Sequence, residues 1–328
     1  MSSNPSPQPL DSTPACIALL SGIIDMQYLA KPFRKANPHI DLRIGRSVTE
    51  LGNLEQIQAA VCWHPPQGLL AQLPNLRLVQ SLAAGIEHIT ADNALPRHIP
   101  LCRIIDPSMA SGMKAFVVWA VVQQQRHMQA YLTNRHLQHW EEQQIVSPQK
   151  HRVGIAGLGT LGLACADVLA DIGYKVQGWS RTAKAELPPG VAGFHGPAQL
   201  ESFLAGCDTL ICLLPLTEET RGFLCTGLFK QLPAQAHLIN VGRGAHLVEA
   251  DLIPALDAGL LSAATLDTFT QEPLPADHPF WADPRILITP HIATRTDHSV
   301  IVRQTLQNLA LIELGRAPNH QVDLSLGY

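Results

Sequence analysis

The stretch that decides the fold is Val153-Gly154-Ile155-Ala156-Gly157-Leu158-Gly159-Thr160-Leu161-Gly162. A short apolar run comes first, three glycines spaced Gly-x-Gly-x-x-Gly follow, and an amphipathic segment then predicts a helix over 160–172. In such a motif Gly157 permits a tight turn, Gly159 lets the backbone approach a pyrophosphate, and Gly162 lets helix and strand pack closely. The free N–H groups and the positive dipole end of the helix face the phosphates. We therefore predict that residues 157–162 form the phosphate-binding loop of a dinucleotide site.

Apolar runs alternate with amphipathic runs on both sides of this motif. Around it the sequence predicts strands at 152–156, 175–179, 209–214, 237–241, 262–266 and 285–288, and further helices at 197–205, 226–231 and 249–258. The first hundred residues predict strands at 16–20, 40–44, 59–63, 78–82 and 101–105, and a helix at 26–35. A long helix at 112–140 is expected to cross between the two sets, and a last helix covers 294–314. The alternation predicts an α/β protein with two Rossmann-like, doubly wound domains.

Composition excludes several classes of protein. The 328 residues carry a formal net charge of −4, so no basic excess is available to coat a nucleic acid. Charged residues make up 15% of the chain, against about 25% in typical soluble proteins, and this low share is consistent with a buried subunit interface. Residues 56–76 are the longest stretch without Asp, Glu, Lys or Arg, but Pro65-Pro66 lies within it, so no membrane-spanning helix is predicted.

The remaining composition indicates a cytoplasmic protein without a bound metal. Residues 1–14 are rich in Ser and Pro and predict a short disordered tail rather than a signal peptide. The seven cysteines are odd in number and lack a Cys-x-x-Cys pair, so we expect reduced core residues. His136 and His139 lie three apart on the long predicted helix, and no second ligand pair stands nearby. We expect them on a solvated helix face and not in a metal site.

The end of the strand after the glycine motif indicates which dinucleotide binds. An NAD site expects an acidic residue about 20 residues after the glycines to accept from the ribose 2′-OH. This chain has Trp179-Ser180-Arg181-Thr182 there, and no carboxylate occurs before Glu186. A guanidinium and two hydroxyls suit a 2′-phosphate. We therefore predict NADPH over NADH, with contacts from Ser180, Arg181 and Thr182; the alternative is that Arg181 is a solvated loop residue.

Three reactive side chains follow three different predicted strands. Arg243 lies between two glycines after the strand at 237–241, Glu272 follows the strand at 262–266, and His291 follows the strand at 285–288. Singly, these residues would pass as a surface Arg, a surface Glu and a capping His. Because the carboxyl ends of parallel strands line the ligand crevice of an open sheet, we expect all three to meet there.

The chain resembles the D-isomer-specific 2-hydroxyacid dehydrogenase family over nearly its whole length, most closely its glyoxylate/hydroxypyruvate reductase A branch. The motifs that carry the resemblance are Trp63-His64-Pro65-Pro66, Ala83-Ala84-Gly85-Ile86, 157–162, Trp179-Ser180-Arg181-Thr182, 214–220, 240–244, 267–274, Thr289-Pro290-His291 and Gly327-Tyr328.

The resemblance implies a discontinuous substrate domain, residues 1–107 and 292–328, with a coenzyme domain, residues 108–291, inserted in it. Arg243 would hold the substrate carboxylate and C2 carbonyl, His291 would be the catalytic histidine, and Glu272 its acidic partner. Main-chain N–H groups of Ala84 and Gly85 would bind the substrate carboxylate. Further cofactor contacts are implied for Leu214, Pro215, Val241, Gly242 and Asp267, the last with the nicotinamide carboxamide. The family pattern also implies a homodimer formed through the coenzyme domains and the long helix.

The expected reaction is the NADPH-dependent reduction of a small α-keto acid, glyoxylate or hydroxypyruvate. Reduced nicotinamide supplies a hydride, and protonated His291 supplies the proton while Glu272 stabilises the imidazolium. Two features depart from the branch: Met113-Lys114-Ala115-Phe116 lacks the usual acidic-aromatic pair, and the loop at 82–85 lacks an extra glycine. They leave the exact substrate open, and Trp63 either lines the substrate pocket or packs in the core.

Other functions stay open from sequence alone. The same site would serve a bulkier 2-keto acid or a phosphorylated hydroxyacid. A dinucleotide-sensing binding protein of the same fold is a further alternative, although such a protein would not need Arg243, Glu272 and His291. Nucleic acid and membrane partners are not expected.

Overall fold

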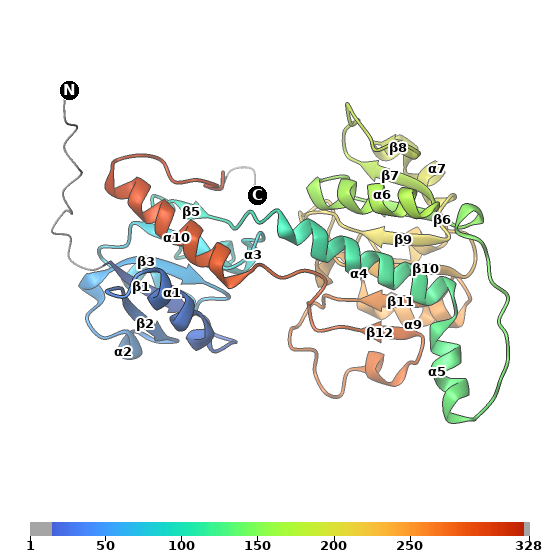
Figure 1. The fold of residues 1–328 in the computed structure, drawn as a ribbon, viewed down its shortest axis with the longest axis horizontal. Coiled ribbons are helices and arrows are strands. Elements are labelled where there is room, and N and C mark those ends of the chain that lie inside the picture. The colour runs from blue at the N-terminus through green and yellow to red at the C-terminus, as the bar shows by residue number, and fades with distance from the viewer. Residues whose placement is uncertain (1–14, 325–328) are drawn as a thin grey trace, which may run out of the picture. The chain divides into compact units, whose positions relative to one another are not determined.

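The computed structural model describes residues 15–324 and shows two compact α/β units. Residues 15–106 and 296–324 form one unit, and Pro107–Arg295 form the other (Figure 1). The chain therefore begins one unit, builds the whole of the other, and returns to complete the first. The predicted fold class, two Rossmann-like units with one inserted in the other, is confirmed. The tail predicted at 1–14 and the Gly327-Tyr328 motif lie outside the described residues.

The discontinuous unit is a five-stranded parallel sheet with helices on it. The strand order is β2-β1-β3-β4-β5, and the strands are β1 Cys16–Leu20, β2 Asp41–Gly45, β3 Ile57–Cys62, β4 Leu78–Ser81 and β5 Leu101–Cys102. Its helices are α1 Ala30–Ala36, α2 Val48–Leu51, α3 Glu87–Thr90 and α10 His298–Glu313, with 3-10 turns at Met26–Leu29, Leu54–Gln56 and Leu70–Gln72. Every residue of β1 is buried, as a central parallel strand covered on both faces requires.

The C-terminal helix α10 belongs to this first unit. Its Ile301 and Leu309 share one apolar core with Ile17 of β1 and Val61 of β3. Asn308 of α10 also donates a side-chain hydrogen bond of 3.0 Å to Gln80 of β4. Residues from opposite ends of the chain thus form one core.

The inserted unit is a seven-stranded parallel sheet in the order β12-β11-β10-β9-β6-β7-β8. Its strands are β6 Arg152–Ala156, β7 Lys175–Ser180, β8 Val191–His195, β9 Thr209–Cys212, β10 Ala236–Asn240, β11 Leu261–Leu266 and β12 Ile286–Ile288. Its helices are α4 Ser108–Gln125, α5 Met128–His136, α6 Thr160–Ile172, α7 Leu200–Leu204, α8 Thr226–Phe229 and α9 Glu249–Asp257, with 3-10 turns at Pro148–Lys150, Pro197–Gln199, Gly244–His246 and Pro279–Ala282.

The strand order reverses between β6 and β9. From β6 the chain proceeds through β7 to β8 on one side and then returns to β9 on the other. Ligands of open α/β sheets bind in the crevice at the carboxyl ends of the strands beside such a reversal. The topology therefore places the predicted glycine loop, which directly follows β6, at the expected binding position.

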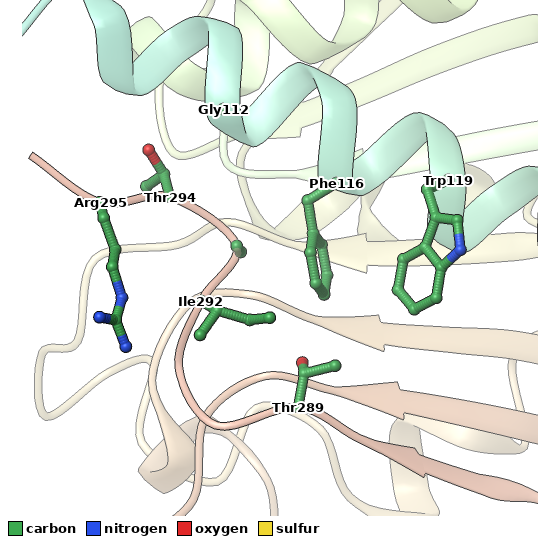
Figure 2. A pocket seen from close by; sticks show the side chains of 8 residues that line it. Gly112, Phe116, Trp119, Thr289, Ile292, Thr294 and Arg295 are labelled. Carbon is green, nitrogen blue, oxygen red and sulfur yellow. The ribbon is translucent and has the colours of Figure 1, made fainter.

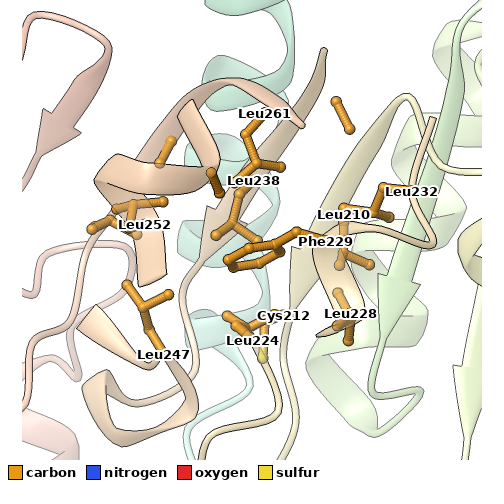
Figure 3. Packing of buried hydrophobic residues seen from close by; sticks show 14 of the residues in the cluster. Leu210, Cys212, Leu224, Leu228, Phe229, Leu232, Leu238, Leu247, Leu252 and Leu261 are labelled. Atoms are coloured by element: carbon orange, nitrogen blue, oxygen red, sulfur yellow. The ribbon is translucent and has the colours of Figure 1, made fainter. Parts of the chain in front are cut away.

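Two apolar cores lie on the two faces of this sheet. One packs α6 through Cys165, Ala166 and Leu169 against Val153 and Ile155 of β6. The buried residues of α6 recur three and four apart, which is the spacing that puts them on one helical face. Figure 3 shows the other core, in which Phe229 and surrounding leucines of α8, α9 and the strands interdigitate.

The structure differs from the sequence prediction at one helix and at one edge strand. The helix predicted over 112–140 is two helices, because His127 adopts a left-handed backbone conformation (φ 54°) that ends α4 and begins α5. No Gly or Pro marks this break, and both helices belong to the inserted unit, so neither is a connector that crosses between units. Strand β8 was not predicted, since its sequence Val-Ala-Gly-Phe-His lacks an apolar alternation; in the structure none of its residues is buried.

Candidate active site

In the loop after β6, the geometry at each glycine agrees with the role predicted for it. Gly157 has φ +110°, which L side chains rarely adopt, and a Cβ there would lie 2.6 Å from the backbone of Leu213. A Cβ at Gly162 would lie 1.9 Å from the Gly157 carbonyl oxygen, so α6 approaches the loop as only glycine allows. At Gly159 a Cβ would meet nothing within 4 Å, which leaves open space over the loop. The loop thus fits a pyrophosphate at the N-terminus of α6.

The three residues predicted to contact a 2′-phosphate, at the end of β7, differ in exposure. Arg181 is largely exposed, with 69% of its side chain accessible, and its guanidinium lies 4.0 Å from the Glu219 carboxylate. Thr182 is exposed. Ser180 is buried, and its hydroxyl donates to the Thr182 carbonyl at 2.8 Å, so it shapes the turn beside Arg181.

His291 and Glu272 form a hydrogen-bonded pair. The Nδ1 atom of His291 lies 2.9 Å from Oε2 of Glu272, and each side chain is about one-third exposed, at 32% and 30%. The other carboxylate oxygen accepts from the N–H of Phe269 at 3.0 Å. Burial by itself would raise the pKa of Glu272, but hydrogen bonds from His291 and Phe269 and the charges of His291 and Arg243 outweigh it. The pKa of Glu272 therefore lies below its usual value.

Hydrogen bonds to Asp267 hold the loop that carries His291. This carboxylate is buried and accepts from the Thr289 hydroxyl at 2.6 Å and from the N–H groups of Ile292 and Ala293 at 2.8 Å. His291 itself has a left-handed backbone (φ 54°), an unusual conformation for a non-glycine residue. Asp267, which the family resemblance assigns to the nicotinamide, thus also fixes the residues on both sides of His291. Sequence reasoning missed this second contact.

Arg243 stands on the loop after β10 and is also held by its neighbours. Its guanidinium donates to the Gly242 carbonyl at 2.8 Å, and its own carbonyl accepts from the Asn240 side chain at 3.0 Å. Its N–H donates to Nδ1 of His246 at 3.0 Å. The structure therefore brings Arg243, Glu272 and His291 to the same end of one sheet. Because His246 belongs to no recognisable motif or spacing, sequence reasoning did not single it out.

The other predicted cofactor residues of this unit lie at the same strand ends. Leu214 and Pro215 follow β9, and Val241 and Gly242 follow β10, beside the strand-order reversal. Leu158 of the glycine loop is buried, so it would offer its main chain rather than its side chain to a ligand.

In the discontinuous unit, the loop after β4 presents main-chain donors. The Ser81 hydroxyl donates to the Gly85 carbonyl at 2.8 Å and accepts from the N–H of Ala83 at 3.1 Å, which closes a tight turn. Within residues 15–324, no hydrogen bond uses the N–H groups of Ala84 and Gly85. Successive main-chain N–H groups of this kind form anion-binding concavities.

Comparison with known proteins identifies the family. Residues 118–293 match the D-isomer specific 2-hydroxyacid dehydrogenase, NAD binding domain. Over 282 residues the chain is 41% identical to glyoxylate/hydroxypyruvate reductase A of Yersinia enterocolitica, which covers 84% of this chain and 90% of that protein. The chain belongs to the D-isomer specific 2-hydroxyacid dehydrogenase family.

Solved structures agree with this assignment. A D-isomer specific 2-hydroxyacid dehydrogenase from Xanthobacter autotrophicus Py2, in complex with NADPH and MES, is 38% identical with a TM-score of 0.85, covering 97% of this chain and 100% of that chain. The NADPH-dependent glyoxylate/hydroxypyruvate reductase of Sinorhizobium meliloti, in complex with NADP and sulfate, is 31% identical with a TM-score of 0.87, covering 96% and 100%. This family member is accordingly an NAD(P)H-dependent oxidoreductase with a nicotinamide dinucleotide cofactor.

Two further features of this dehydrogenase are the packing of Trp63 and an apolar pocket beside α4. Trp63, half-buried, packs against the apolar core of its unit, and its ring also lies 4.5 Å from that of His88 and 5.0 Å from that of His64. In the inserted unit, a pocket of about 410 Å³ lies between α4 and the segment after β12. Figure 2 shows Phe116 and Trp119 of α4 facing Ile292 and Thr289 across it. The pocket is mainly apolar, with Arg295 at its edge.

The remaining findings concern metals, thiols and membranes. Within the described residues, no group of three His, Cys, Asp or Glu side chains is placed to hold a metal ion. Six of the seven cysteines are buried and all are free thiols. No helix in residues 15–324 is both long enough and apolar enough to span a bilayer.

Proposed function

We propose that this oxidoreductase reduces glyoxylate and hydroxypyruvate to the corresponding 2-hydroxy acids, with NADPH as the hydride donor. The observation that carries the proposal is the His291–Glu272 pair, which stands with Arg243 at the carboxyl end of a dinucleotide-binding sheet. Relatives named glyoxylate/hydroxypyruvate reductase A at 38–41% identity support this substrate class.

His291 is the proton donor in this proposal. Its Nδ1 faces Glu272, and the proposal takes Nε2 as the nitrogen that delivers a proton to the new alkoxide. Because Oε1 of Glu272 already accepts from Phe269, its Oε2 is held toward the imidazole. The carboxylate stabilises the imidazolium and fixes the ring orientation. When bound, the reduced nicotinamide supplies the hydride to C2 of the keto acid.

Arg243 and the loop after β4 would hold the substrate. The guanidinium of Arg243 pairs with the substrate carboxylate and polarises the C2 carbonyl, where negative charge develops. The N–H groups of Ala84 and Gly85 add donors without adding charge. Trp63 is the third substrate contact that we propose in the discontinuous unit. We accordingly assign cofactor binding to the inserted unit, and substrate binding to Arg243 of that unit and to the loop after β4 in the discontinuous unit.

The preference for NADPH rests on the end of β7. Arg181 presents an exposed guanidinium and Thr182 an exposed side chain, while Ser180 shapes the turn that carries them. A planar cation suits a 2′-phosphate, and β7 ends without the carboxylate that a ribose 2′-OH would need. The relatives solved with NADPH and NADP support the same choice.

The decisive assay follows NADPH absorbance with purified protein and glyoxylate or hydroxypyruvate. Turnover of about one per second or faster, within the ordinary range for enzymes, is the expected result. Bulkier 2-keto acids run in parallel wells. Turnover of those acids alone would refute the proposed substrate class, and NADPH binding without any turnover would refute the proposed reaction.

A further inference from the structure

One buried imidazole joins the two loops that the proposed function uses. His246 is fully buried at the end of the loop after β10. Its Nδ1 accepts a hydrogen bond of 3.0 Å from the N–H of Arg243, and its Nε2 lies 3.3 Å from the carbonyl oxygen of Pro215, after β9. A single side chain thus connects the residue proposed to bind substrate with a residue proposed to contact cofactor.

The hydrogen bonds define the tautomer of His246. A main-chain N–H can only donate, so Nδ1 must carry a lone pair toward Arg243. A carbonyl can only accept, so Nε2 must carry the hydrogen toward Pro215. Nδ1 also lies 3.1 Å from the Arg243 carbonyl, but that oxygen accepts from the Asn240 side chain instead. The neutral ring protonated at Nε2 satisfies both contacts.

Packing holds the ring close to the Arg243 backbone. A Cβ at Gly242 would lie 2.8 Å from Nδ1 and 3.0 Å from Cε1 of His246, closer than ordinary contacts allow. The ring therefore lies against the main chain one residue before Arg243, where only glycine leaves room. A displaced ring would leave the N–H of Arg243 without this partner and the backbone without this support.

We infer that His246 is the positioning residue of Arg243, holding its backbone at a fixed place relative to the loop after β9. The inference rests on the proposed function, because it takes Arg243 to bind the keto-acid carboxylate. It predicts that changes at His246 alter the KM for keto acid far more than the affinity for NADPH. A shift of about 1 Å in a binding group is costly because charged hydrogen bonds depend on close alignment.

Three substitutions separate the two hydrogen bonds of His246. The amide oxygen of His246→Asn can accept from the Arg243 N–H, the longer amide of His246→Gln can donate to the Pro215 carbonyl, and His246→Leu can do neither. We expect His246→Leu to raise the KM for glyoxylate by about tenfold, as loss of a buried hydrogen bond suggests. His246→Asn should restore most of this loss, His246→Gln should not, and the Kd for NADPH should stay within about threefold throughout.

The control is His237, a buried histidine of β10. It lies near the start of that strand, at the end opposite Arg243, and its side chain hydrogen-bonds to the Thr265 hydroxyl. His237→Leu should lower the melting temperature and leave both KM and kcat unchanged. If His246→Leu behaves in the same way, its role is structural only and the inference is wrong.

The outcomes separate this inference from the proposed function. Wild-type protein that turns over neither keto acid would refute the proposed function. Wild-type turnover combined with unchanged KM in all three His246 variants would refute the inference alone. If His246→Leu does not fold, the inference is tested by comparing His246→Asn with His246→Gln. Equal KM values for glyoxylate in these two variants would overturn the inference.

Discussion

At the scale of single residues, the His291–Glu272 pair carries the proposed chemistry. A positioned general acid contributes about 100- to 10,000-fold to rate. His291→Ala is therefore expected to lower kcat at least about 100-fold while the Kd for NADPH, measured by fluorescence titration, stays unchanged. The exposed His98, in the other unit, provides the control substitution to Ala. Retention of wild-type kcat in the His291 variant would remove His291 from the mechanism.

The low pKa of Glu272 leads to a pH prediction. The carboxylate is charged throughout the neutral range, so Glu272→Gln removes a negative charge that favours the protonated imidazole. The alkaline limb of the kcat/KM profile for keto-acid reduction should move to lower pH in this variant. The measurement is a series of initial rates between about pH 5 and pH 9, the range in which histidine normally titrates. An unmoved profile would mean that Glu272 only orients the ring.

The proposed preference for NADPH gives a prediction for the pair Arg181 and Glu219. Arg181→Ala should abolish the preference, whereas Glu219→Gln should strengthen it, because the Glu219 carboxylate would compete with a 2′-phosphate for Arg181. An exposed pair contributes at most about 1 kcal/mol, so the expected gain is no more than about fivefold in Kd. Glu218→Gln is the matched control, since Glu218 pairs with Arg221 instead. Equal effects of the two glutamate variants would contradict the assignment.

At the scale of elements, substitutions at two glycines of the loop after β6 should separate an effect on stability from an effect on cofactor binding. Gly162→Ala would place a Cβ against the Gly157 carbonyl and force α6 away from β6, so it should cost about 1–3 kcal/mol of stability. Gly159→Ala meets no neighbouring atom in the protein and should leave the melting temperature unchanged while weakening NADPH binding. Calorimetry and cofactor titration of both variants test this contrast. Normal cofactor affinity in Gly159→Ala would place the pyrophosphate elsewhere.

The same element shows how far sequence could predict the fold. Strand β6 and helix α6 fall at the predicted residues, because an apolar strand, a glycine turn and a 3.6-residue periodicity follow one another without interruption. The break at His127 and the edge strand β8 were missed, because neither has a local signal. At such positions packing with distant residues overrides local preference.

The site could be predicted only in part, for a related reason. Arg243, Glu272 and His291 were predictable because they are chemically reactive and follow strands of one parallel sheet. The contacts of His246 with Pro215 and of Asp267 with the His291 loop join residues 22–31 positions apart. Such contacts exist only once the strands are assembled, so no spacing in the sequence reveals them.

At the scale of the whole molecule, buried histidines make stability depend on pH. His237 is buried, and burial lowers its pKa to about 3, with the charge of His151 adding to the effect. The unfolded chain, with a value near 6.5, therefore binds a proton that the folded chain does not between these two pH values. Stability should be complete above about pH 6.5 and should fall as pH is lowered, by up to about 1.4 kcal/mol per pH unit for one such group.

Urea unfolding at several pH values tests this dependence. Wild-type protein should lose stability between about pH 6.5 and pH 5, a range above the ordinary titration of carboxylates. His237→Leu should flatten the curve over that range. An equally steep curve in the variant would assign the effect to other groups, such as His151, whose pKa burial also lowers.

We propose that the chain forms the homodimer that the family resemblance implies, and the surface of the inserted unit supports this proposal. Large apolar side chains are exposed on α5 and the segment after it, with Trp140 fully accessible and Leu137 70% accessible. Monomers rarely expose such a group of residues without a partner. Sedimentation should show a dimer at micromolar concentration, and the double variant Leu137→Ser/Trp140→Ser should shift it toward monomer. A wild-type monomer under these conditions would refute the proposal.

The interrupted connectivity of the first unit also has a consequence for synthesis on the ribosome. The sheet of residues 16–102 emerges early but lacks the apolar face of α10, which is translated almost 200 residues later. The inserted unit contains its own cores and has all its strands before α10 appears. The nascent chain must therefore carry an open, apolar N-terminal sheet while its middle folds, a state in which chaperones would bind it. A ribosome stalled before residue 298 should expose this sheet to protease, and release of the full chain should protect it.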